Sequence, residues 1–101
     1  MPRDTADRLA IRDLVENWAV YRDARLWDLF RTVWHKEGWM MATWYQGPYE
    51  EFIRQGKEGY DKGVRFLHFL GGTSIELKGK RAIAQTKMTI SQRATVDGVQ
   101  C

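Results

Sequence analysis

Cysteine is almost absent from this chain of 101 residues, since it occurs once, at the last position. A single cysteine excludes a disulfide framework within the chain and a zinc site built from cysteine ligands. Long hydrophobic runs are also missing, and every apolar stretch is far shorter than the ~20 residues that cross a bilayer. We therefore expect no internal disulfide, no cysteine–zinc site and no membrane-spanning segment.

Several motifs that carry chemistry are absent as well. The pair Gly71-Gly72 lacks the spacing of a phosphate-binding loop, and no Gly-x-Ser-x-Gly sequence marks a nucleophile elbow. The two histidines, His35 and His68, are not at metal-ligand spacing, and no carboxylates cluster with them. We expect neither a cofactor nor a metal site.

The charge is balanced rather than strongly of one sign, with 16 Lys and Arg against 13 Asp and Glu and a net charge of +3. The positive residues are spread along the chain, which argues against a nucleic-acid surface. The first ten residues are charged throughout, unlike a signal peptide. These features predict a cytoplasmic protein.

Aromatic residues, in contrast, are abundant: five Trp, four Tyr and four Phe. Apolar residues make up 44% of the chain and charged residues 29%, the balance of a soluble globular protein. The length is that of one domain, over residues 1–101. So many aromatics exceed what a minimal core needs, and they suggest a wide apolar cavity or an oligomer interface.

Three helices are predicted by apolar residues at helical spacing. The first begins near Asp4 or Thr5, either of which can cap it, and runs to about Tyr21. A short second helix follows and forms a helical hairpin with the first. A third covers Tyr49–Tyr60 despite two interior glycines. The apolar positions are Ile11, Leu14, Val15 and Trp18, then Leu26, Leu29, Phe30 and Val33, and then Tyr49, Phe52, Ile53 and Tyr60.

Strands are predicted at Trp39–Tyr45 and over most of the second half. Val64–Leu77 is one long bent strand, or two, with Gly71-Gly72 as a bulge. After a turn at 78–80, Arg81–Thr95 alternates over an unusual length, which is typical of a half-buried antiparallel strand. The order of elements predicts an α+β domain, in which a strongly bent antiparallel sheet wraps around the helices and encloses a cone-shaped cavity.

The last residues predict a strand that is cut short. Asp97-Gly98 is a hairpin-turn dipeptide, and Val99–Cys101 begins a partner strand of three residues. So short a segment cannot pair along the whole of the predicted strand Arg81–Thr95. The free edge of that strand is therefore open, is covered by another chain, or belongs to a domain that continues beyond Cys101. We expect the last of these.

His68 is the most informative candidate for chemistry. It stands in Phe66–Leu70, an apolar strand where a histidine has no structural necessity. If the pleat turns Phe66, His68 and Leu70 toward the cavity, the imidazole can act there as a base at neutral pH, provided that an acceptor orients it. The alternative is a core histidine that is hydrogen-bonded to a backbone carbonyl.

Asp23, at the end of the first helix, is the candidate acceptor. The helix dipole disfavours a negative charge at the C-terminal end of a helix, so we expect Asp23 to have a role other than stabilising the helix. A solvated turn residue or an N-cap of the second helix is the alternative.

The remaining candidates are less specific. The aromatic side chains of Trp39, Trp44 and Tyr45 line the mouth of the cavity or fill a core. We expect His35 to be exposed after the second helix, and Lys87 to be solvated or at an interface. Cys101 has no activating neighbour and is a poor nucleophile.

Three segments of the chain resemble the SnoaL-like proteins, which belong to the superfamily of cone-shaped α+β folds named after nuclear transport factor 2. The resemblance covers essentially the whole chain, and it implies that fold. It is less specific for function, because the fold hosts dehydratases, isomerases, cyclases, dioxygenase small subunits and binding proteins. The segments are Ala10-Ile11-Arg12-Asp13-Leu14-Val15, Tyr21-Arg22-Asp23 with Leu26-Trp27-Asp28-Leu29-Phe30, and Phe66-Leu67-His68-Phe69-Leu70-Gly71-Gly72.

Within the superfamily, the pattern is most similar to scytalone dehydratase and hexachlorocyclohexane dehydrochlorinase. The resemblance implies a catalytic dyad of Asp23 and His68, and an oligomer, dimer or trimer, formed through the open face of the sheet. We thus expect a cofactor-independent lyase or isomerase for a small apolar molecule, which binds against Trp39, Trp44, Tyr45, Phe66 and Met88. The alternatives are a non-catalytic binding or oligomerisation module, or the small subunit of a ring-hydroxylating dioxygenase.

Overall fold

The computed structural model describes residues 3–96 and 99–100. Helices come first and a long antiparallel strand pair comes later, so the predicted α+β class is confirmed. The predicted turn Asp97-Gly98 and residue Cys101 lie outside the described residues. The elements are α1 (Arg3–Asp23), α2 (Trp27–Arg31), β1 (Trp39–Met41), β2 (Gln46–Pro48), α3 (Tyr49–Asp61), β3 (Arg65–Lys78), β4 (Arg81–Arg93), β5 (Thr95–Val96) and β6 (Val99–Gln100).

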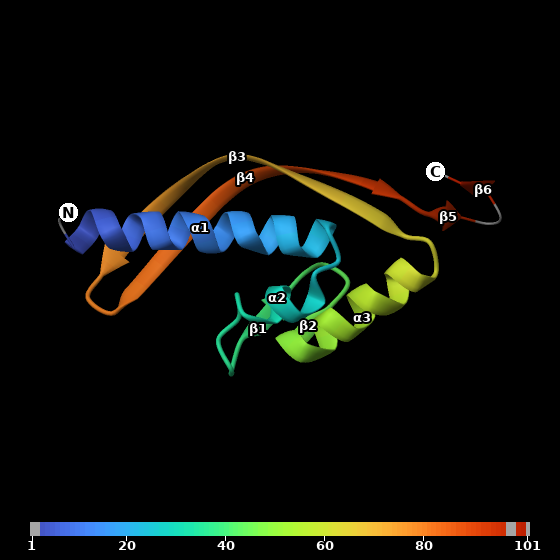
Figure 1. Cartoon of the computed structure of the whole chain (residues 1–101), viewed down its shortest axis with the longest axis horizontal. Coiled ribbons are helices and arrows are strands. Elements are labelled where there is room, and N and C mark those ends of the chain that lie inside the picture. Colours follow the sequence, from blue (N-terminus) through green and yellow to red (C-terminus); the bar gives the residue numbers. More distant parts are fainter. Residues whose placement is uncertain (1–2, 97–98, 101) are drawn as a thin grey trace.

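The β3–β4 ribbon sets the shape of the molecule. It curves over α1, which lies along its concave side, while α2, α3 and the β1–β2 hairpin gather near the C-terminal end of α1 (Figure 1). The molecule measures 54 × 27 × 23 Å. The apolar face of α1 thus faces a curved sheet surface, as expected for a helix covered by a bent sheet.

The long bent strand was correctly predicted. β3 pairs antiparallel with β4 from Arg65↔Arg93 to Lys78↔Arg81, and the register shifts between Leu70 and Thr73. Gly72 in that shift has φ +118°, a conformation that L side chains rarely adopt. The one extra residue on β3 bends the strand, because a bulge kinks it and increases its twist.

The prediction that β4 is half-buried is wrong for this chain. Its alternation does place Ala84, Thr86, Met88 and Ile90 on the side that faces α1. However, Met88 is 44% exposed and Ile90 51%, because the β3–β4 sheet has only two strands and α1 covers only part of its concave side. The concave face is therefore accessible from the β4 side.

The single strand predicted over Trp39–Tyr45 is also wrong, because the chain turns back at 42–45 into a hairpin. The N–H of Ala42 donates to the carbonyl of Tyr45 at 2.7 Å, and β1 pairs with β2. The Tyr45 ring folds against Gly47, where a Cβ would collide with it, and its hydroxyl donates to the carbonyl of Pro48 at 2.9 Å. A small residue at position 47 thus allows the turn.

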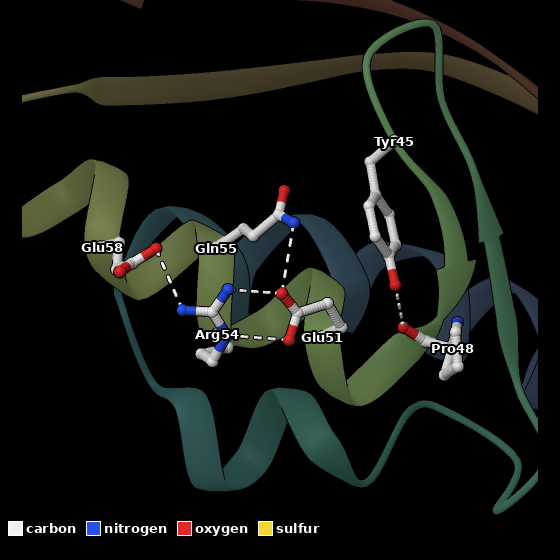
Figure 2. A network of polar contacts seen from close by, with 6 residues as sticks. All are labelled: Tyr45, Pro48, Glu51, Arg54, Gln55 and Glu58. Carbon is white, nitrogen blue, oxygen red and sulfur yellow. Dashed lines mark hydrogen bonds and ion pairs between the residues drawn. The ribbon is translucent and has the colours of Figure 1, made fainter.

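The third helix agrees with its prediction within one residue, and its surface carries a polar network (Figure 2). Arg54 donates two hydrogen bonds to Glu51, one of them from Nε at 2.7 Å, and it pairs with Glu58 at 3.1 Å. The hydrogen bonds from Arg54 and Gln55 lower the pKa of Glu51 to about 2. These groups are solvent-exposed, so the network orders the surface of α3 more than it stabilises the fold.

The core lies where α2, α3 and the end of α1 meet. Phe30, Phe52 and Ile53 are fully buried, and Tyr49 completes the cluster. The Phe52 ring is the centre, because aromatic rings from α1, α2, the 32–38 segment and the β1–β2 loop surround it. Much of the aromatic surplus therefore serves as the core, and Trp44 and Phe66 border a cavity beside His68.

Candidate functional site

Asp23 and His68 are brought together from positions 45 residues apart. Asp23 is the last residue of α1, and its Oδ2 accepts a hydrogen bond from the backbone N–H of His68 at 2.6 Å. Its Oδ1 lies 2.5 Å from Nδ1 of the same histidine. The His68 side chain is 4% exposed and that of Asp23 15%. One carboxylate therefore holds both the backbone and the ring of His68.

This geometry sets the protonation pattern of a neutral imidazole. An ionised carboxylate only accepts hydrogen bonds, so the Nδ1 that faces it must carry the proton. The lone pair of the neutral ring is then on Nε2, the nitrogen on the other side of the ring. Asp23 is thus placed to orient a base and to stabilise the imidazolium that forms when the base accepts a proton.

Neither of the alternatives for these two residues matches the contacts. Nδ1 of His68 meets a carboxylate and not a backbone carbonyl. The N-cap position of α2 is Leu26, and no side chain caps that helix. The Trp18 ring stands at 90° to the His68 ring with the centroids 5.3 Å apart, so the imidazole is confined by packing as well as by Asp23.

Two neighbouring cavities border His68. The larger, of about 440 Å³, lies between α1 and the concave face of β3–β4. The smaller, of about 240 Å³, lies toward the β1–β2 loop and Phe52. Four side chains line both: Trp18, Met40, His68 and Ile90. The walls are mostly apolar, so water competes poorly with the polar contacts made there.

The predicted binding residues are divided between these cavities and other places. Trp44 and Phe66 line the smaller cavity and Met88 the larger one. Trp39 lines neither and is exposed on β1. Tyr45 packs on Phe52 with ring centroids 6.2 Å apart, on the core side, and lines neither cavity. Burial raises the pKa of Tyr45, with a smaller contribution from Glu51.

The remaining candidates lie outside the cavities. His35 is exposed, and its Nδ1 accepts a hydrogen bond from the N–H of Glu37 at 3.0 Å. Lys87 is exposed on β4. Both positions agree with what the sequence predicted.

Two residues of the site were missed in the sequence: Trp18 and Arg22. Both lie on the face of α1 that packs toward β3 and α3, four residues apart. In the sequence, Trp18 belongs to the apolar stripe of its helix, and Arg22 belongs to the spread positive charges and to the family-like segment Tyr21-Arg22-Asp23. The available signal was the helical spacing, which puts Trp18 and Arg22 one turn apart beside Asp23.

Arg22 is almost fully buried, at 5% exposure. Its guanidinium lies 4.6 Å from the centre of the Phe52 ring and 4.8 Å from that of Phe66. Burial lowers the pKa of Arg22 to about 10, although the nearby charge of Asp23 acts in the opposite direction. The group therefore remains charged at neutral pH, inside an apolar wall.

The described part of the chain shows neither a metal-binding cluster nor a membrane-spanning helix. Within residues 3–96 and 99–100, no three His, Cys, Asp or Glu side chains form a group that could hold a metal ion. Among the same residues, no helix has the length and the apolar character to cross a membrane. The expectation of no metal and no cofactor stays a prediction.

Comparisons with known proteins give matches along most of the chain. A family model described as SnoaL-like domain matches residues 3–100. A PEP2-like protein of Fusarium vanettenii is 38% identical over 97 residues, which are 93% of this chain and 42% of that protein. Pea pathogenicity protein 2 of the same fungus is 38% identical over 95 residues, 91% of this chain and 41% of that protein. An uncharacterised protein of Aspergillus terreus is 36% identical over 104 residues. The chain spans about four tenths of the length of these curated relatives.

Proposed function

The chain belongs to the SnoaL-like family of the nuclear transport factor 2-like superfamily, and from this premise we propose that it is a cofactor-independent lyase or isomerase. The substrate is a small apolar molecule, and the reaction is of the dehydratase or dehydrohalogenase type or a related proton shift. His68 is the general base and Asp23 orients it. The observation that carries the proposal is the 2.5 Å contact between Nδ1 and Oδ1 beside an apolar cavity.

The proposed step begins at Nε2 of His68. This nitrogen removes a proton from a carbon of the substrate, and the C–H electron pair forms a double bond to the neighbouring carbon. In a lyase reaction, the leaving group departs from that neighbour with its electron pair. In an isomerisation, the neighbouring carbon already carries a double bond, whose π pair shifts to the next carbon and takes the proton back from the imidazolium there. Asp23 stabilises the imidazolium in both cases, because its charge is already in place.

Replacing His68 with alanine is expected to lower kcat by about 10²–10⁴-fold, the usual contribution of a general base. The probe is 4-hydroxy-4-phenylbutan-2-one, a small aromatic β-hydroxy ketone that loses water to give a conjugated enone. The enone is followed by its near-ultraviolet absorption. Because the buried ring and its bond to Asp23 are lost, far-ultraviolet circular dichroism must show that the variant is folded.

The matched control for His68→Ala is His35→Ala, which removes the other, exposed histidine and is expected to leave kcat unchanged. If His68→Ala dehydrates the probe as fast as the wild type, His68 is not the base. If the wild type is no faster than buffer, a non-catalytic binding or oligomerisation module becomes the better description.

An oligomer formed through the sheet is the second part of the proposal. Leu67, Phe69 and Ile83 lie exposed on the face of β3–β4 opposite to that of His68, and exposed large apolar side chains favour association. Sedimentation equilibrium at micromolar concentration is expected to give a dimer or trimer. A monomer with these side chains in water contradicts this part and leaves the catalytic part unaffected.

A further inference from the structure

The smaller cavity beside His68 is bordered by a cation, Arg22, that forms no ion pair among the residues that the structure describes. Its Nη1 is fully buried and has no hydrogen-bond partner. Buried polar groups in folded proteins are nearly always paired, because an unpaired one loses its hydration without compensation. A buried guanidinium with an unpaired nitrogen beside a cavity therefore requires an explanation.

The neighbours of Arg22 hold it without neutralising it. The faces of Phe52 and Phe66 lie against the guanidinium, and Gly56 of α3 leaves room for it, since a Cβ there would be 3.2 Å from Nη1. Asp23 is the next residue, but both of its carboxylate oxygens bond to His68 and it makes no ion pair with Arg22. Nη1 itself therefore packs on the Gly56 side, while Arg22 places a charge that none of the described carboxylates pairs with in the wall of the smaller cavity.

We propose that Arg22 binds a carbonyl or carboxylate oxygen of the ligand, so that the substrate class is small apolar molecules with such an oxygen next to the reacting C–H. The assignment to a reacting carbonyl rests on the proposed function. When His68 Nε2 takes the proton, the C–H electron pair forms a C=C bond and the carbonyl π pair moves to oxygen. The resulting enolate oxygen accepts hydrogen bonds from the guanidinium, which keeps its own protons.

The position of Arg22 suits this role. It is adjacent in sequence to the residue that orients His68, and both Arg22 and His68 line the smaller cavity. An apolar wall strengthens the attraction between a guanidinium and a negative oxygen, because little water screens it. A leaving group on the next carbon is then expelled from an enolate that is already stabilised. Among the described residues that line this cavity, Arg22 supplies the Lys or Arg cation, and it lies where negative charge would develop.

The test is the affinity for two probes of equal shape, 2-naphthoate and its neutral amide 2-naphthamide, measured by isothermal titration calorimetry. The wild type is expected to bind naphthoate at least about 10-fold more tightly, as for a hydrogen bond to a charged group. Arg22→Met should reduce the preference to less than about 2-fold, and Arg22→Lys should retain part of it. Arg12→Met, which removes an exposed charge of the same helix, should keep the full preference.

Several outcomes overturn the proposal. A wild type without preference for naphthoate, or an Arg22→Met variant that keeps the preference, contradicts it. A purely structural Arg22 would weaken the binding of both probes equally and leave their ratio unchanged, which also contradicts it. If Arg22→Met does not fold, the wild-type Nε–H resonance of Arg22 decides: it should shift with naphthoate and not with naphthamide.

The role of His68 as base and the role of Arg22 in binding an oxygen can each be contradicted without the other. His68→Ala is expected to lose turnover and to keep the naphthoate preference, because the cation is untouched. Turnover without the preference removes Arg22 from the mechanism and leaves His68 as the base. If the wild type prefers naphthoate over naphthamide but does not turn over the probe, the cavity binds anions and the proposed reaction is contradicted.

Discussion

Replacing Asp23 with asparagine is expected to lower kcat by about 10³–10⁴-fold, while the fold is kept. An asparagine Oδ1 can still accept the hydrogen bond from the backbone N–H of His68, but its NH₂ group then faces Nδ1 of the ring. A neutral His68 must respond by carrying its proton on Nε2. The nitrogen that should act as base is thereby blocked, as when the orienting aspartate of a serine-protease triad is replaced.

The measurement that separates this explanation from a general loss of structure is the tautomer of His68. Nitrogen-15 chemical shifts should report Nδ1–H in the wild type and Nε2–H in the Asp23→Asn variant, together with the fall in kcat on 4-hydroxy-4-phenylbutan-2-one. Asp13→Asn is the control, because Asp13 is an exposed carboxylate of the same helix. A variant that changes the tautomer without losing turnover would show that Nε2 is not the base.

Replacing Phe52 with alanine is expected to lower the free energy of unfolding by about 3–5 kcal/mol, the usual cost of removing a buried phenylalanine ring. Phe52 is 1% exposed, and its ring packs between Trp18, Trp34 and Trp44. Small domains are stable by only about 5–15 kcal/mol, so much of the stability would be lost. Urea unfolding followed by far-ultraviolet circular dichroism measures the change.

The control for Phe52→Ala is Met41→Ala, on β1, where the side chain is 67% exposed. A change within about 0.5 kcal/mol is expected there, as for most surface substitutions. If the two variants lose equal stability, the cluster around Phe52 is not the core of this protein. The guanidinium of Arg22 also rests on the Phe52 ring, so the cavity beside His68 depends on this packing.

The local patterns were enough to locate most of the elements. The spacing of Ile11, Leu14, Val15 and Trp18 predicted α1, and the glycine pair at 71–72 predicted the bend of β3. Such signals succeed because helical periodicity and glycine freedom act between near neighbours. The segment 39–48 failed, because an aromatic run does not show where the chain turns back. The turn depends on the fit between the Tyr45 ring and Gly47.

The contact between Asp23 and His68 could be predicted only in part from the sequence. An aspartate at a helix C-terminus and a histidine in an apolar strand were each unusual for their places, so the sequence by itself determined which two residues needed an explanation. Only the tertiary structure decided that they share two hydrogen bonds, because the curvature of β3 brings His68 to the end of α1.

The cysteine-poor, aromatic-rich composition had likewise determined that packing, and not cross-links, must hold this chain together. Which aromatics fill the core and which border a cavity was decided by the fold: Tyr45 packs on Phe52, while Trp44 and Phe66 reach the hollow beside His68. Arg22 shows the same division. The sequence shows its charge, but the burial of its guanidinium with Nη1 unpaired results from three elements, α1, α3 and β3, that meet around it.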